Sequence, residues 1–312
     1  MRPRDSGLAR HIATVLATFD QTRAMPGIRT SKRRDALIEQ VLESIHRVGY
    51  VGRLLERGTS SRRADPNDEL FDPLKAAIYY MQRGDVDEAF WMVFLFVHFG
   101  KHKRGGWRYA REVYGRLGNA TRWDWGAVST RPAMFRQWLD AHLSDLKRPG
   151  AGFGNHRKYQ SLDGKSATGT GAAVESYIKW VSPPQGHAEL IRDACQRQKG
   201  NKRDTFDYLY QSMDSVVSFG RVARFDYLTM VGKLKLGPIE PGSAYLRGAT
   251  GPLLGARLLF ANNPKATLSA DDIDEWLVEL DARLGVEFGL QVLEDSLCNW
   301  QKSPDRFAPF RG

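Results

Sequence analysis

Two acidic residues lie where a carboxylate could take part in breaking a glycosidic bond. Asp226 lies among apolar neighbours in the run SVVSFGRVARFDYLTMVGKL, residues 215–234, and Glu240 lies in GPIEPG. Such a carboxylate can stabilise the positive charge that develops on a sugar, or direct water to the anomeric carbon. Asp226 could instead be a half-buried partner of Arg221 or Arg224. Glu240 could equally be a solvated loop acid.

The segment around Asp226 is typical of a helix-hairpin-helix element. An apolar helix end precedes Phe219-Gly220, and a second helix follows whose inner face carries Val222 and Phe225. A glycine permits a tight turn, and the first N–H groups of the second helix can then point at a DNA phosphate. Arg221 and Arg224 would add positive charge on the same side. An ordinary corner between two helices is the alternative.

Two further stretches combine basic and aromatic residues on backbone that is rich in glycine. One is the run 148–171, and the other is KHKRGGWRYAR, residues 101–111. Such residues suit phosphate contacts and stacking on an extruded base, although a solvated basic loop has the same composition. The candidate DNA-binding residues in these stretches are His156, Arg157, Lys158, Tyr159, Lys165, Lys101, Lys103, Arg104 and Trp107.

A third glycine-rich segment, YLRGATGPLLGARLLF, covers residues 245–260. Its glycines at 248, 251 and 255 would let the backbone approach a phosphate or sugar closely, with Arg257 binding pyrophosphate and Tyr245 stacking on a base. Close packing of helices through small residues is the alternative. No Gly-Lys-Ser/Thr follows, so the segment is not a Walker motif.

Composition favours a polyanionic partner and argues against metal chemistry. The 312 residues include 46 Lys and Arg against 36 Asp and Glu, a net charge of +10, although charge alone does not separate DNA from RNA or an anionic membrane. Cys195 and Cys298 form no CxxC pair, and HExxH and GxSxG motifs do not occur. We therefore expect no metal, no cofactor and no disulfide framework.

The N-terminus lacks the apolar run of a signal peptide, and the most apolar stretch, Ala89 to Phe99, is about half the length that spans a bilayer. We therefore expect a buried helix there and a soluble, cytoplasmic protein without a membrane partner.

Apolar periodicity predicts an all-α fold with long basic loops. Helices are expected over 28–55, from Pro73 to near Gly84, from an N-cap at Asp85 to a stop at Gly100, from Pro132 onward, and after Ala172 with breaks at Pro183–Gly186, Gly200, Gly220, 237–242 and 262–264. We predict an N-terminal segment, 1–28, and two helical subdomains, 29–150 and 151–312, packed as one catalytic unit.

From about Arg29 to the C-terminus the chain resembles the alpha-glutamyl/putrescinyl thymine pyrophosphorylase family. These helical proteins are related to the helical domain of hydroxymethyluracil DNA kinases and are likened to helix-hairpin-helix DNA glycosylases. The segments that carry the resemblance are DALIEQVLESIHRVGYV, HFGKH followed by GWR, HRKYQSL, FGRVARFDYL, GATGPLLGARLLF and LEDSLCNWQK. Glu240 lies 20 residues beyond Gly220, similar to the offset between hairpin and catalytic aspartate in such glycosylases.

The resemblance implies an enzyme that acts on a modified base in double-stranded phage DNA. An antiviral member looks like a glycosylase that excises glucosylated hydroxymethylcytosine and leaves an abasic site, and we predict this activity here. The alternative is a transferase that replaces pyrophosphate on phosphorylated hydroxymethyluracil with an amino acid or polyamine, and a second alternative is a non-catalytic DNA-binding module. No kinase domain with a Walker motif is present, and no obligate protein partner is implied.

Overall fold

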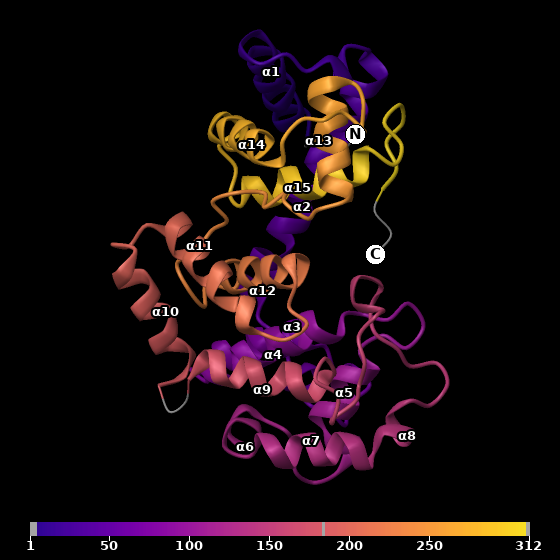
Figure 1. Cartoon of the computed structure of the whole chain (residues 1–312), viewed down its shortest axis with the longest axis vertical. Coiled ribbons are helices and arrows are strands. Elements are labelled where there is room, and N and C mark those ends of the chain that lie inside the picture. Colours follow the sequence, from indigo (N-terminus) through magenta and orange to yellow (C-terminus); the bar gives the residue numbers. More distant parts are fainter. Residues whose placement is uncertain (1–4, 183–184, 310–312) are drawn as a thin grey trace. The chain divides into compact units, whose positions relative to one another are not determined.

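The computed structural model describes residues 5–182 and 185–309, and its regular structure in these ranges is helical (Figure 1). The one extended pairing within these ranges is an isolated bridge between His102 and Gly106. The predicted all-α fold is therefore confirmed. The likeness to helix-hairpin-helix glycosylases stays a prediction. In the described part of the chain, no helix combines the length and apolarity that crossing a membrane requires.

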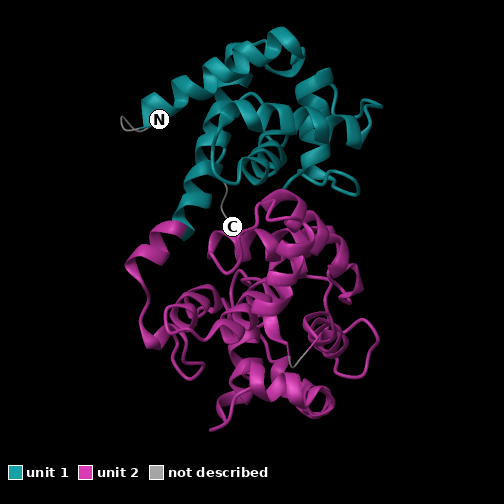
Figure 2. Ribbon diagram, turned by 90° about the vertical axis from the view of Figure 1, so that its left-hand side faces the viewer, with its two compact units in different colours: residues 1–51, 241–312 teal, residues 52–240 magenta. Residues whose placement is uncertain are grey.

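The chain divides into two compact units (Figure 2). Unit 1 comprises Met1–Val51 and Pro241–Gly312, and unit 2 comprises Gly52–Glu240. The two subdomains proposed from the sequence, 29–150 and 151–312, are each one continuous stretch of chain, and they follow chain order. The units do not, because most of the long early helix buries its apolar face among helices from the end of the chain.

The described residues of unit 1 form five α-helices around a mainly aliphatic core. They are α1 (Ser6–Thr22), α2 (Ser31–Arg57, whose last turns belong to unit 2), α13 (Gly251–Ala261), α14 (Ala270–Leu284) and α15 (Gly289–Trp300), with a 3-10 turn, η2 (Pro26–Ile28). Leu37, Leu259, Leu277 and Leu293 are among the buried side chains of this core. The helix predicted over 28–55 is α2.

Unit 2 contains the remaining helices. They are η3 (Ser61–Arg63), α3 (Pro73–Met81), α4 (Val86–Phe99), α5 (Arg108–Tyr114), η4 (Arg116–Gly118), α6 (Trp125–Thr130), α7 (Pro132–Ala141), α8 (Leu143–Leu146), η5 (Asn155–Arg157), α9 (Thr170–Val181), α10 (Gly186–Arg197), α11 (Lys202–Ser212), η6 (Met213–Ser215) and α12 (Arg221–Lys233).

Helix α4 is the central element of unit 2 and packs against α3, α10 and α12. It is buried almost all round, as its continuous apolar sequence requires. Asp85 caps its first turn by accepting the Glu88 N–H, and Gly100 ends it with φ 61°. Pro73 and Pro132 begin α3 and α7. These predicted helix boundaries are confirmed, whereas Pro183, in the predicted break before Gly186, lies outside the described residues.

Candidate functional site

The connection between α8 and α9, residues 147–169 and here called the site loop, is anchored on the end of α4. The Gly154 N–H donates to the Phe99 carbonyl at 2.8 Å. A Cβ on Gly154 would lie 2.8 Å from the carbonyl carbon of Gly100, so a side chain there would force the two backbones apart. Phe153 stacks on Phe99, with ring centroids 5.7 Å apart. The glycine-rich sequence is therefore an ordered loop held against α4.

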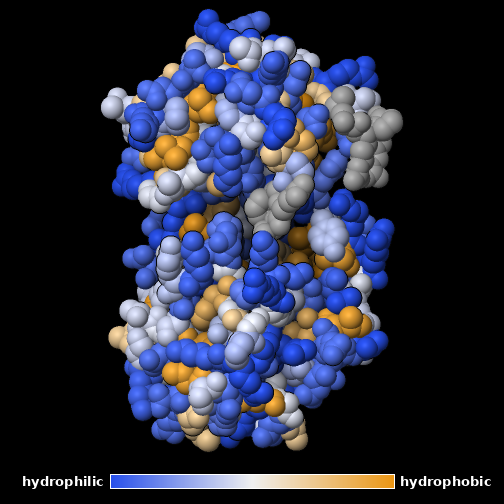
Figure 3. All heavy atoms as spheres, turned by 90° about the vertical axis from the view of Figure 1, so that its right-hand side faces the viewer, coloured by the Kyte–Doolittle hydropathy of each residue, from blue (hydrophilic) through white to orange (hydrophobic). Residues whose placement is uncertain are grey.

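The site loop also contacts the basic turn that follows α4. A Cβ on Gly105 would lie 2.4 Å from the Gly150 carbonyl oxygen, so the two basic stretches singled out from the sequence are neighbours in space. Together they present exposed polar and aromatic side chains, which we call the basic surface: Lys101, Lys103, Arg104, His156, Lys158 and Tyr159. Figure 3 faces the side of Figure 1 on which these loops lie, and the surface there is mostly hydrophilic.

Tyr159 and Trp107 differ sharply within this region. Tyr159 is 88% exposed, and the Lys158 ammonium lies 5.0 Å from its ring centroid. Trp107 is half-buried and packs on Phe96 at 5.1 Å between centroids. The structure therefore leaves Tyr159 available for stacking, whereas most of Trp107 contributes to the support beneath the surface.

Arg157, one residue away from the exposed tip of the site loop, points inward and is only 7% exposed. Its Nε donates to the His98 carbonyl at 3.2 Å, and its Nη2 donates to the Ser218 carbonyl at 3.0 Å. Burial lowers the pKa of Arg157 to about 10, and the negative charge of Asp226 opposes that shift. Arg157 therefore ties the site loop to α4 and to the turn before α12, beside the candidate carboxylate.

His98, on the last turn of α4, was not selected by sequence reasoning, although a lone histidine inside AFWMVFLFVHF was a signal for it. Its Nε2 lies 2.9 Å from the Thr170 hydroxyl, which donates its single proton to the Ser161 carbonyl at 2.8 Å. Nε2 must therefore be the donor, and Nδ1 is a buried acceptor with no hydrogen-bond partner in the described residues. Burial, and then the charge of Arg157, lower the pKa of His98 well below its usual value, so the ring is neutral.

The turn before α12 is tight, but its left-handed residue is Ser218 (φ 63°) rather than glycine. Gly220 is the N-cap of α12 in an extended conformation, with φ −70°. The expectation that glycine makes the turn is therefore wrong in detail. The Ser218 hydroxyl donates to the Thr168 carbonyl at 2.9 Å, which holds the turn against the site loop. The N-cap residue, Gly220, makes no side-chain cap bond, and a phosphate contact at the first turn of α12 stays a prediction.

The two arginines of α12 pack along unit 2. The Arg224 guanidinium lies 3.0 Å from the Asp214 carboxylate and 4.6 Å from the Tyr210 ring centroid. Arg221 lies 5.9 Å from the Phe225 ring centroid. Asp226 itself is half-buried.

Glu240 lies in a different environment from Asp226. Its carboxylate is 3.2 Å from Arg203 Nη2, and its N–H donates to the Lys202 carbonyl, at the start of α11. Helix α11 has 11 residues and is thus about 16 Å long, with the turn that carries Ser218 beyond its far end. The charge of Asp226 acts on Arg157, whereas Glu240 lies at the other end of α11.

The third glycine-rich segment belongs to unit 1 and is a helix-packing surface. A Cβ on Gly255 would lie 2.2 Å from the Leu297 carbonyl oxygen, which shows how closely α13 approaches α15. Arg257 donates through Nε and Nη2 to the Leu268 carbonyl, at 3.2 and 2.9 Å. Tyr245 has a left-handed backbone, with φ 51°. The packing interpretation therefore describes Gly255, and the binding roles of Arg257 and Tyr245 stay a prediction.

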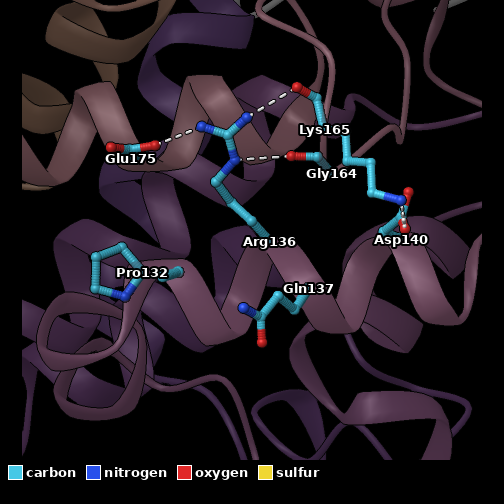
Figure 4. Close-up of a pocket in the computed structure, with 8 residues that line it drawn as sticks. Pro132, Arg136, Gln137, Asp140, Gly164, Lys165 and Glu175 are labelled. Carbon is cyan, nitrogen blue, oxygen red and sulfur yellow. Dashed lines mark hydrogen bonds and ion pairs between the residues drawn. The ribbon is translucent and has the colours of Figure 1, made fainter.

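Lys165 lies at a cavity of about 510 Å³ between α7 and the site loop (Figure 4). Its ammonium is 2.6 Å from Asp140 Oδ2. Arg136 binds Glu175 at 2.6 Å and also donates to the Gly164 and Lys165 carbonyls, at 2.7 and 3.0 Å. These charges are paired with one another. The contacts around the cavity therefore serve mainly to hold the site loop against α7.

Comparison with known proteins gives one result. The family model described as alpha-glutamyl/putrescinyl thymine pyrophosphorylase clade 3 matches residues 32–312. No curated protein and no solved structure gives a significant match. Within the described residues, no cluster of three or more His, Cys, Asp or Glu side chains has the arrangement of a metal site.

Proposed function

The chain belongs to the alpha-glutamyl/putrescinyl thymine pyrophosphorylase family, and from this membership we propose an enzyme that acts on a modified pyrimidine in double-stranded DNA. The reaction that we propose is excision of the base in antiviral defence, with glucosylated hydroxymethylcytosine of phage DNA as the first substrate to test. One observation carries the choice of site: Asp226 is half-buried beside Arg157, which also anchors the loop of the basic surface.

The basic surface would bind the DNA backbone and hold an extruded nucleotide. Lys158 and its exposed neighbours supply positive charge for phosphates, and Tyr159 supplies an exposed ring on which a base can stack. Arg157 is buried and donates to the His98 and Ser218 carbonyls, so we assign it to positioning Asp226 and the loop.

Asp226 would stabilise the positive charge on the sugar and take a proton from the attacking water. The water oxygen bonds to the anomeric carbon as the glycosidic C–N bond breaks, and the electron pair of that bond leaves with the base. The base then takes up a proton from solvent, and Asp226 returns its own proton to solvent. The products are a free base and an abasic site.

The test is single-turnover incubation with phage DNA that carries glucosylated hydroxymethylcytosine, hydroxymethyluracil derivatives or no modification. Mass spectrometry detects the released base, and an aldehyde probe detects abasic sites. Asp226→Asn is expected to slow release about a hundredfold or more, whereas Glu240→Gln is expected to retain wild-type rates. Wild-type rates in Asp226→Asn would exclude this assignment of the carboxylate, and no release from any DNA would exclude excision of these bases.

A second candidate function follows from the family description, which specifies a pyrophosphorylase. Here an amino acid or polyamine nitrogen would bond to the methylene carbon of a pyrophosphorylated hydroxymethyluracil, pyrophosphate would leave, and the amine would lose a proton. The products distinguish the two reactions, because transfer leaves an alkali-stable backbone and releases pyrophosphate rather than a base. Binding without chemical change would favour a DNA-binding module.

A further inference from the structure

Unit 2 contains a cavity of about 520 Å³, lined by residues of η4, α6, α7 and the segments that join them, that the proposed function does not use. Arg116, Arg122 and Arg131 line it, and Asp124 is the one acidic residue among the described residues that do so. The Asp124 carboxylate is occupied as the N-cap of α6, where it accepts the Ala127 N–H at 2.8 Å. The walls of the cavity therefore carry net positive charge.

Two of these arginines are not neutralised by the protein. Arg122 lies 3.4 Å from the Asp65 carboxylate, but neither Arg116 nor Arg131 forms an ion pair within the part of the chain that the structure describes. Arg131 is exposed, so its guanidinium can turn toward a ligand. A cavity with two unpaired arginines favours an anionic occupant.

Two residues that line the cavity also carry donor atoms that are buried behind its wall. Arg116 Nε and Trp123 Nε1 are both inaccessible to solvent and have no hydrogen-bond partner among the described residues, and the Arg116 guanidinium lies 4.8 Å from the Trp123 ring centroid. Guanidinium and indole N–H groups can only donate. A buried donor without a partner is costly, but neither atom is reached by solvent, so an occupant of the cavity would contact Arg116 through its terminal Nη groups.

The backbone holds Arg116 in this orientation. Arg116, Leu117 and Gly118 have φ values of 51°, 59° and 87°, three left-handed residues in a row. Arg116 Nη1 also donates to the Thr121 hydroxyl at 2.6 Å. Left-handed backbone is unfavourable for residues with a Cβ and persists where the surrounding structure imposes it, often at ligand sites. The bond to Thr121 and the contact with the Trp123 ring therefore hold the guanidinium on this turn.

We infer that this cavity binds an oxyanion of the phosphate class, either phosphate or diphosphate. The planar guanidinium of arginine matches such oxygens with two parallel hydrogen bonds. The anion could be free in solution or could belong to a nucleic-acid backbone, and the two sources share this chemistry. The inference is independent of which reaction Asp226 supports, because the cavity and Asp226 share no residue.

Titration calorimetry with sodium diphosphate at constant ionic strength tests the site. Arg131→Gln and Arg116→Gln are each expected to weaken binding about tenfold. Arg131 is exposed, so its variant should fold normally, and thermal melting checks Arg116→Gln. The control is Arg197→Gln, which removes the same charge from an exposed position at the end of α10; its affinity is expected to equal that of the wild type.

Duplex binding, followed by fluorescence anisotropy at several salt concentrations, identifies the source of the anion. If the cavity holds a backbone phosphate, Arg131→Gln lowers duplex affinity, the salt slope falls by about one, and diphosphate competes with DNA. If it holds a free anion, diphosphate binding weakens and duplex affinity is unchanged. Equal diphosphate and duplex affinities in the wild type and in the Arg131 and Arg116 variants would overturn the inference.

Discussion

The two units of this chain bury different kinds of side chain. The core of unit 1 is mainly aliphatic, and its buried ionisable groups, among the described residues, are the carboxylates Asp5 and Asp281. Unit 2 buries Glu88, His98, Arg157 and His187, none more than 7% exposed. Burying such groups costs free energy unless they are hydrogen-bonded. The comparison indicates that unit 2 keeps a costly polar interior, which is typical of a unit that carries a reaction site.

A hydrogen-bonded chain shows how unit 2 holds these groups. Asp87 contacts His187 Nδ1 at 2.7 Å, His187 Nε2 contacts the Tyr177 hydroxyl at 2.6 Å, and that hydroxyl contacts the Tyr227 hydroxyl at 2.8 Å. These residues lie on α4, α10, α9 and α12. Since Tyr227 is next to Asp226, these hydrogen bonds fix the position of α12, the helix that carries the candidate carboxylate. Directional bonds of this kind specify one arrangement of helices more strictly than aliphatic contacts do.

The largest expected effect is a difference in the free energy of unfolding between two variants, each of which replaces one arginine, one in each unit. Arg157→Leu removes a buried cation that binds the His98 and Ser218 carbonyls, and we expect the free energy of unfolding to fall by about 3 kcal/mol. Arg257→Leu, in unit 1, removes donors to the single Leu268 carbonyl and should cost about 1 kcal/mol. Urea unfolding measures both. Equal losses would contradict the contrast between the units.

The next effect concerns two close backbone approaches. Gly255→Ala forces a Cβ toward Leu297 between α13 and α15, and Gly154→Ala forces one toward Gly100 under the site loop. Each should lower the free energy of unfolding by about 2 kcal/mol. Duplex affinity separates them, because Gly154 supports the basic surface whereas Gly255 lies in unit 1. Weakened DNA binding in Gly255→Ala, with Gly154→Ala unchanged, would reverse the assignment of the two segments.

The pH dependence of stability is the third test, and it depends on buried groups of unit 2. Burial lowers the pKa of His98 and, despite Asp87, that of His187 from 6.5. Each neutral histidine contributes to the free energy of unfolding. This contribution is complete above pH 6.5 and is lost as pH falls below it, by up to about 1.4 kcal/mol per pH unit. Burial has the opposite effect on Glu88, raising its pKa from 4.5 to about 7. The stability from its neutral form is present below pH 4.5 and is lost as pH rises toward 7.

Between pH 4.5 and 6.5 the effect of Glu88 on the free energy of unfolding is opposite in sign to that of each histidine, so it cancels the effect of one of them. Glu88→Gln removes the offset, so the loss of stability below pH 6.5 should steepen by about 1.4 kcal/mol per pH unit. Urea unfolding at several pH values between 5 and 8 measures the slope. An unchanged slope in Glu88→Gln would show that Glu88 is already ionised in the folded state across this range.

The smallest expected effect on stability comes from the basic surface. Lys158→Gln should reduce the salt slope of duplex binding by about one and weaken affinity a few-fold. Its free energy of unfolding should stay within about 0.5 kcal/mol of the wild type. Lys265→Gln, an exposed position in unit 1, is the matched control and should leave the salt slope unchanged. Equal slopes in both variants would exclude Lys158 from the DNA contact.

The sequence by itself determined the helices and several of their ends. The apolar run from Ala89 to Phe99 allowed only a buried helix, and Asp85, Gly100 and Pro132 set boundaries through local chemistry: a side-chain cap, a glycine C-cap with positive φ and a fixed φ. These signals act within a few residues of the chain, so they can be recognised without the fold. The same local information singled out Asp226, the basic stretches and the glycine-rich segments as candidates.

Only the tertiary structure decided between interpretations that were locally equivalent. Glycine-rich sequence is the same whether it lets one backbone approach another, as at Gly154, or one helix approach another, as at Gly255. The local sequence around an arginine in a basic loop is the same whether the side chain faces solvent or, like that of Arg157, turns inward. The partners that decide these cases, Gly100, Leu297 and Ser218, lie more than 40 residues away in sequence. Long-range packing and the desolvation that accompanies it therefore assigned roles that residue type left open.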